Sequence, residues 1–112
     1  MMVKFIFTHQ GAFGIVINNE VEGLPGYHDS KGWMWSTNGK KLFSNSGVEN
    51  CNLREFPDMV GKEVLMTYNG KLKQLVISVG AFNVTQKDAN WPEKVYFAFT
   101  LVELGEVRLL SD

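Results

Sequence analysis

His28, Asp29 and Ser30 are the three side-chain types of a hydrolytic triad, and they are consecutive in the chain. In such a triad the serine attacks the substrate, the histidine takes its proton and the aspartate orients the histidine. Three adjacent residues cannot converge on one substrate atom in that order. The sequence therefore predicts no hydrolytic centre at this point, and we expect a protein that is not an enzyme.

Metal and nucleotide binding lack the residue patterns that they require. Histidine occurs at positions 9 and 28 and cysteine at position 51 alone, at no spacing typical of a zinc site. No loop has the alternating Asp and Asn with glycine of a calcium site. Gly11-Ala12-Phe13-Gly14 stands between two predicted strands, so no helix N-terminus follows it to bind a phosphate. We expect neither a metal nor a cofactor.

Aromatic residues are the remaining candidates for a site. Trp33 and Trp35 alternate with Met34, which in a strand places the two indoles on one face of a sheet and the methionine on the other. Large indoles in a small β-protein favour core packing. Tyr27 lies in a long loop containing Gly23, Pro25 and Gly26, where the ring either anchors a ligand peptide or covers the underside of its own loop.

The elements that position these residues are predicted to be strands. Apolar residues recur with period two or in short runs bounded by Gly, Asn, Asp and Pro, and helix-length periodic stretches are absent. Residues 3–7 and 13–17 each present one apolar face, with Gly11 as the turn between them, and they are predicted to pair. Residues 95–101 and 106–110 complete the chain as two further strands.

Two Asn-Gly pairs, Asn38-Gly39 and Asn69-Gly70, predict two-residue type I′ turns. The first joins residues 33–37 to 40–44 and the second joins 63–68 to 71–79. Three stretches are predicted to be irregular because of their Gly, Pro, Asn and Asp content: residues 18–31, 46–58 and 81–94. About seven strands joined by hairpins and loops predict an all-β fold, an antiparallel β-sandwich.

Length and charge bound the function classes. The 112 residues, 45% of them apolar, fit a single domain over residues 1–112. Eleven basic and twelve acidic side chains leave no basic surface for nucleic acid or anionic lipid. No apolar run is long enough for a transmembrane span, the N-terminus does not read as a signal peptide, and Cys51 has no partner. We expect a cytoplasmic or nuclear protein that contacts no membrane and no nucleic acid.

Read in order, these motifs resemble a SPRY domain of the Ran-binding-protein-M-like kind. The central match is Leu24-Pro25-Gly26-Tyr27 followed by Gly32-Trp33-Met34-Trp35 and the hairpin to Phe43. In the same order as in the family come Phe13-Gly14-Ile15-Val16-Ile17, Phe56, Gly61-Lys62-Glu63-Val64, Asn69-Gly70-Lys71-Leu72, Ala81-Phe82 and Gly105-Glu106-Val107. The resemblance covers roughly residues 5–110 and indicates a short variant that lacks the family's first strands.

The resemblance implies a concanavalin-like, SPRY-type sandwich that binds a short peptide or a partner protein through loops at one end. Such domains are non-catalytic and serve as substrate adaptors in ubiquitin ligases or as scaffold subunits. Carried over by position, the binding loops are residues 19–29 and 102–105. They offer apolar anchors and polar contacts that suit a peptide with basic or amide side chains: Leu24, Tyr27, Val102 and Leu104, with Glu20, Glu22, His28 and Glu103.

Two alternatives remain beside the interaction module. A lectin-like carbohydrate-binding domain needs an exposed aromatic platform next to amides or carboxylates. Trp91 with Asn83, Asp88 and Asn90 is the cluster of that kind, and its irregular stretch leaves both core packing and exposure open for the ring. A structural subunit would pair through an exposed sheet edge with another chain, because the strands that the family places first are missing. That edge is expected at the strand carrying Val3 and Phe5.

Overall fold

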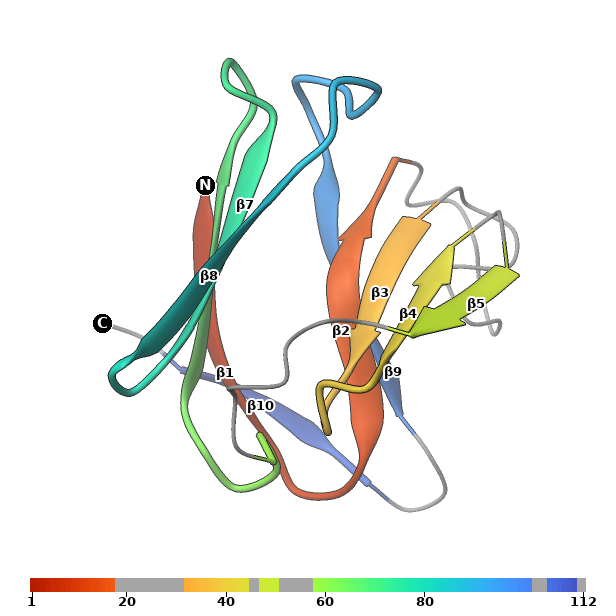
Figure 1. Ribbon diagram of the computed structural model, residues 1–112. Coiled ribbons are helices and arrows are strands. Elements are labelled where there is room, and N and C mark those ends of the chain that lie inside the picture. Colours follow the sequence, from red (N-terminus) through yellow and green to blue (C-terminus); the bar gives the residue numbers. More distant parts are fainter. Residues whose placement is uncertain (18–31, 45–46, 51–57, 102–104, 111–112) are drawn as a thin grey trace.

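The computed structural model describes residues 1–17, 32–44, 47–50, 58–101 and 105–110. Within these residues the chain is all-β, and its strands form two five-stranded antiparallel sheets packed as a β-sandwich (Figure 1). The predicted fold class is confirmed, and the described strands outnumber the seven or so predicted. None of the described residues belongs to a helix long and apolar enough to cross a membrane.

The first sheet has the strand order β10-β1-β6-β7-β8 and the second has the order β5-β4-β3-β2-β9. Strands of the first sheet are β1 (Met2–Phe7), β6 (Val64–Asn69), β7 (Gln74–Val79), β8 (Phe82–Lys87) and β10 (Val107–Leu110). Strands of the second sheet are β2 (Gly11–Val16), β3 (Gly32–Ser36), β4 (Lys41–Ser44), β5 (Gly47–Asn50) and β9 (Tyr96–Leu101).

Strands β1 and β2 do not pair, contrary to the prediction. They lie in different sheets, and their apolar faces meet across the core, with the rings of Phe5 and Phe13 5.3 Å apart. Both strands have a period-two apolar face, and that pattern is equally suited to pairing and to face-to-face packing. β1 is also not an edge strand: it lies between β10 and β6, with Val3 half-buried and Phe5 fully buried. The expected edge at Val3 and Phe5 is therefore wrong.

The hairpins keep their predicted strands but not their predicted turns. Trp35 pairs with Leu42 as expected, yet in the first turn it is Gly39 that has positive φ, at 74°, while Asn38 does not. The Gly39 N–H donates to the Ser36 carbonyl, so a turn followed by a left-handed glycine replaces the type I′ form. In the second hairpin Asn69 pairs with Gln74, which makes the loop four residues long.

Two strands occupy stretches that were predicted to be irregular. β5 pairs with β4 within residues 46–58, and β8 pairs with β7 within residues 81–94. Among the described strands β8 borders only β7, and only one face of its six residues is partly buried. The half-buried residues of that face, Val84 and Gln86, alternate with exposed neighbours, which gives a weak apolar pattern in the sequence. Prediction failed here because polar residues dominate an edge strand.

The core lies between the two sheets and is rich in aromatic rings. Trp33 and Trp35 face it while Met34 is buried on the opposite face of the second sheet, as the alternation predicted. The smaller cluster on that opposite face also contains Ala12 and Val16. The buried members of the main core are Phe5, Phe7, Phe13, Ile15, Trp35, Met59, Val64, Met66, Tyr68, Leu75, Ile77, Val79, Trp91 and Val95.

Candidate functional site

The binding residues predicted from the sequence lie outside the described residues. This holds for Glu20, Glu22, Leu24, Tyr27 and His28 in the first segment and for Val102, Glu103 and Leu104 in the second. The described strands beside the two segments nevertheless fix where each departs from the sheet. The first follows the β2 end that pairs with Tyr96, and the second follows Leu101, which pairs with Gly11 at the other end of β2. These two points are about 17 Å apart along the strand.

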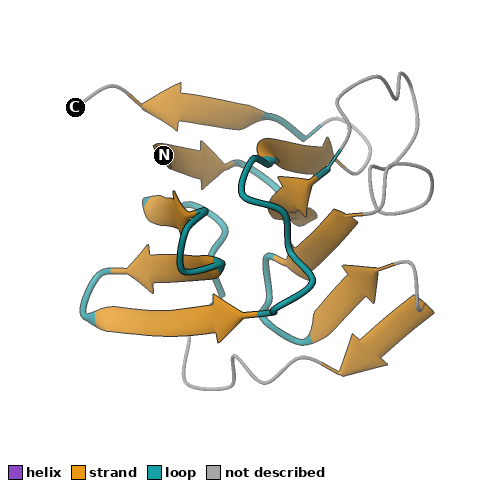
Figure 2. Ribbon diagram, turned by 90° about the horizontal axis from the view of Figure 1, so that it is seen from above, coloured by secondary structure: helices purple, strands orange, loops and turns teal. Residues whose placement is uncertain are grey.

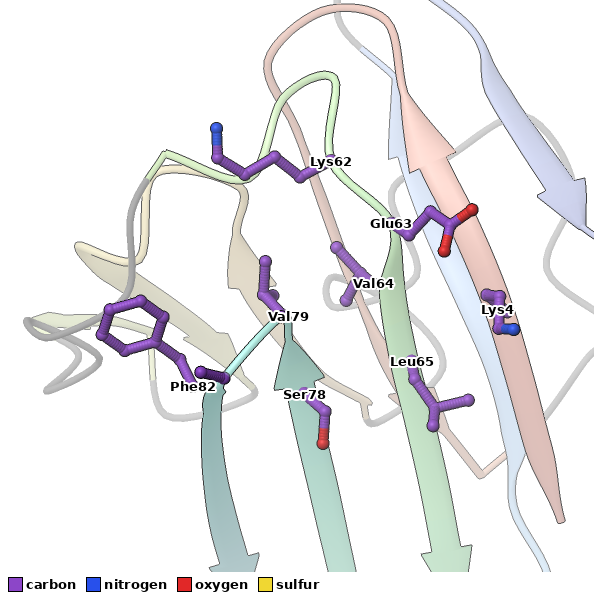
Figure 3. A pocket seen from close by; sticks show the side chains of 10 residues that line it. Lys4, Lys62, Glu63, Val64, Leu65, Ser78, Val79 and Phe82 are labelled. Carbon is purple, nitrogen blue, oxygen red and sulfur yellow. The ribbon is translucent and has the colours of Figure 1, made fainter.

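A groove of about 570 Å³ opens in the first sheet where β6 and β7 diverge (Figure 3). The two strands pair only as far as Leu65 opposite Ser78. Beyond that point Val64 pairs with Phe5 of β1, whereas Val79 pairs with Phe82 of β8. Because each strand follows its other neighbour, the sheet splits and leaves an open hollow of the size typical of ligand sites.

Apolar side chains form most of the groove wall. Val64 and Val79 are buried and form its floor, while Leu65 is half-buried and Phe82 is 43% exposed at the rim. Phe82 is one of the large apolar side chains that remain exposed in the described part of the chain. An exposed phenylalanine beside a hollow with an aliphatic floor suits an apolar group of a ligand.

Charged side chains also line the groove. Lys4, Lys62 and Glu63 are its ionisable lining residues, two cations against one anion. Figure 3 shows Lys62 extending over the side of Val79, whereas Glu63 turns toward the side of Lys4. The end of the groove at Lys62 therefore combines an exposed cation with an apolar floor.

The turn that closes the groove is a tight hairpin that sequence reasoning missed. Val79 pairs with Phe82, so Gly80 and Ala81 form a two-residue loop, and Gly80 has a φ of 59°. A glycine with positive φ at the first of two central positions is the requirement of a type II′ turn. The sequence contains the signal for this turn, a Gly-Ala pair between apolar residues. It was missed because an irregular stretch was predicted to begin at Ala81.

A second hollow of about 500 Å³ lies at the other end of β6. Tyr68, Asn69 and Gly70 line it together with Lys71 and Glu93. Burial raises the pKa of the Tyr68 phenol, whose hydroxyl donates to the Pro92 carbonyl. This hydroxyl connects the β6–β7 hairpin to the segment before β9, which gives it a structural role.

Trp91 is not an exposed platform. It is 3% exposed, and its ring centroid lies 5.6 Å from that of Trp33, 6.4 Å from Trp35 and 6.1 Å from Tyr68. The carbohydrate-binding alternative requires this ring at the surface, whereas a ring within a polar stretch here folds back into the core. Among the described residues its indole N–H, like that of Trp35, has no hydrogen-bond partner.

Metal ligands do not gather in the part of the chain that the structure describes, where no group of three or more His, Cys, Asp or Glu could hold an ion. His9 is exposed, and its Nδ1 lies 3.0 Å from the Thr8 hydroxyl. The Asp58 carboxylate accepts from the Gln10 amide at 2.8 Å and from the Val60 N–H at 3.0 Å. The Thr8 hydroxyl also accepts from the Glu106 N–H at 3.0 Å, so these contacts connect neighbouring turns and strand ends.

Comparison with models of protein families, with curated proteins and with solved structures gave no match for this chain. The β-sandwich and the groove therefore rest on the geometry of this chain alone.

Proposed function

We propose that the chain is a non-catalytic protein-interaction module, similar to a SPRY domain, that binds an extended peptide segment of a partner protein in the groove between β6 and the β7–β8 turn. The observation that carries the proposal is the split of the sheet after Leu65 and Ser78, which creates an open, largely apolar hollow beside an exposed phenylalanine. An adaptor or scaffold role would follow from such binding.

The lining of the groove specifies the kind of peptide. A bulky apolar side chain would cover Val64 and Val79 and pack against Phe82. A carboxylate next to it in the peptide would face Lys62. An extended segment fits better than a helix, because a two-residue turn and a strand end border the hollow on either side.

The experiment is selection of peptides from a displayed random library on the folded domain, followed by titration calorimetry with an enriched peptide. Phe82→Glu and Ala81→Trp change exposed residues, the first placing a charge at the rim and the second filling the hollow. Each should weaken binding by a factor of ten or more, since truncation of a central anchor commonly costs about 2 kcal/mol. Leu72→Glu, at an exposed apolar residue outside the groove, is the matched control and should bind as wild type does.

Two results would overturn the assignment. Absence of any enriched peptide would contradict peptide binding itself. Binding that survives both groove variants but is lost in Tyr27→Ala combined with Leu104→Asp would move the site to the predicted loops and leave the module without this groove.

A further inference from the structure

Strand β10 is an apolar edge strand of the first sheet. Among the described strands it borders only β1, and Figure 2 shows it at the margin of its sheet beside the strand that carries the N-terminus. Leu109 is 64% exposed, the highest value among the large apolar side chains of the described residues. β8, at the other margin of this sheet, carries Asn83, Thr85 and Lys87 on one face. Polar and lysine-bearing edges discourage pairing, and β10 lacks a lysine or a proline.

The backbone of β10 has hydrogen-bonding groups directed to the open side. The Thr8 N–H donates to the Glu106 carbonyl at 2.9 Å, and the Thr8 hydroxyl accepts from the Glu106 N–H at 3.0 Å. In an antiparallel ladder the residues that bond one neighbour alternate with those that face away. The backbone N–H and C=O groups of Arg108 and Leu110 therefore point toward β1. Those of Val107 and Leu109 point away from it.

The apolar surface continues from β10 to the edge of the second sheet. Val107 and Leu109 lie opposite Phe7 and Phe5, on the core-facing side of their strand. β9 faces this region, because the Phe99 ring lies 4.9 Å from the ring of Phe5. Phe99 is only half-buried, so core-facing side chains remain partly exposed along this side of the sandwich.

We propose that two copies of this chain associate through antiparallel pairing of their β10 strands, with Val107 opposite Val107 of the second copy. This register is chosen by charge. It places Glu106 opposite Arg108 of the second copy, and Arg108 opposite the second Glu106, giving two complementary cross-strand pairs. It also sets Leu109 against Gly105 of the second copy, where no side chain obstructs it.

Other registers that use the same outward backbone groups are less favourable. Shifting by one residue on each strand puts Arg108 directly opposite Arg108 of the second copy, and like charges at directly opposed positions destabilise a sheet. Shifting the register by a further residue on each strand places Leu109 opposite Leu109 of the second copy and Arg108 opposite its Leu110. Both charge pairs are lost in that register. A second copy is thus a complementary occupant of this edge in one register.

The dimer edge is separate from the proposed peptide groove. Val64, Val79 and Phe82 belong to the β6, β7 and β8 side of the sheet and β10 is the opposite margin. β1, which contributes Lys4 to the groove, lies between them. Both copies would keep their grooves open, so a bivalent partner could engage two at once. The contact from Gly105 to Leu109 is short, so we expect a weak dimer that forms with rising concentration.

The test is sedimentation equilibrium of the full chain over roughly 1 µM to 1 mM, a range that covers weak association. Glu106→Arg and Arg108→Glu alter exposed side chains, at 55% and 67% exposure, and each should weaken self-association about tenfold because both cross-strand pairs become repulsive. An equimolar mixture of the two variants should dimerise again, since one chain then carries arginine at both positions and meets glutamate at both positions of the other. Recovery in the mixture cannot come from an effect within one chain.

Leu109→Lys provides an independent variant, and Leu72→Lys is its control at an exposed apolar residue away from the edge. The first should be monomeric throughout the range and the second should dimerise as wild type does, both with the circular dichroism of a folded chain. A wild type that stays monomeric, single charge variants that dimerise as wild type does, or a mixture that fails to recover would each overturn the proposal. Loss of peptide binding would not affect this result, because the two surfaces are separate.

Discussion

Replacement of Trp91 by alanine tests whether this ring belongs to the core. The side chain is 3% exposed and contacts three other aromatic rings, so truncation removes about 200 Å² of buried apolar surface, worth about 5 kcal/mol at ~25 cal/mol/Å². The same truncation removes an indole N–H that is buried without a partner among the described residues. Its removal offsets the loss in free energy of unfolding by about 1–3 kcal/mol. We therefore expect Trp91→Ala to lower the free energy of unfolding by about 3 kcal/mol.

The assay is urea denaturation followed by far-ultraviolet circular dichroism, because Trp91 itself would contribute to a fluorescence signal. Leu72→Ala, at a side chain that is 54% exposed, is the control and should change the free energy of unfolding by less than about 0.5 kcal/mol. A Trp91→Ala effect as small as that of the control would contradict burial of the ring. It would place the ring at the surface and restore the carbohydrate platform as a candidate.

Two further predictions concern the β6–β7 hairpin. Gly70→Ala should lower the free energy of unfolding by about 1–3 kcal/mol, because the added methyl group would overlap the Glu93 carbonyl oxygen. The same urea titration measures this change, and an effect no larger than that of Leu72→Ala would argue against the close approach. Tyr68→Phe should be about 1 kcal/mol less stable than wild type at neutral pH, since it loses the hydrogen bond to Pro92. Because burial raises the pKa of Tyr68 above its usual value near 10, the unfolded chain ionises first, and this stability is complete below pH 10 and lost as the pH rises through the folded-state pKa. The gap between the two proteins should thus narrow above pH 10 in thermal melts, and a constant gap would be inconsistent with the raised pKa.

Local patterns predicted the fold class because strand alternation is a property of neighbouring residues. Trp33, Met34 and Trp35 take the faces that their spacing indicated. The pairing of Trp35 with Leu42 likewise follows from the turn residues between them. These features depend on the pleat and on backbone conformation over a few residues.

The candidate site was not predictable in the same way. The groove exists because the end of β6 pairs with β1 while the end of β7 pairs with β8. The residue types of Val64 and Val79 do not determine which neighbouring strand each one pairs with. The signal that was available, Gly80 between two apolar residues, locates the turn but not the hollow beside it. The residues that the resemblance indicated, Tyr27 and Leu104 among them, lie outside the described residues and stay a prediction.

Neighbouring residues were sufficient to indicate that this chain forms strands, where two of its hairpins turn and which side of several strands is apolar. Long-range packing was needed to establish that β1 and β2 oppose each other across the core, that Trp91 is buried and that β10, not β1, is an edge among the described strands. The difference arises because an apolar face only needs to be covered. Whether a paired strand, a facing sheet or a tryptophan from a distant turn covers it depends on contacts far apart in the chain.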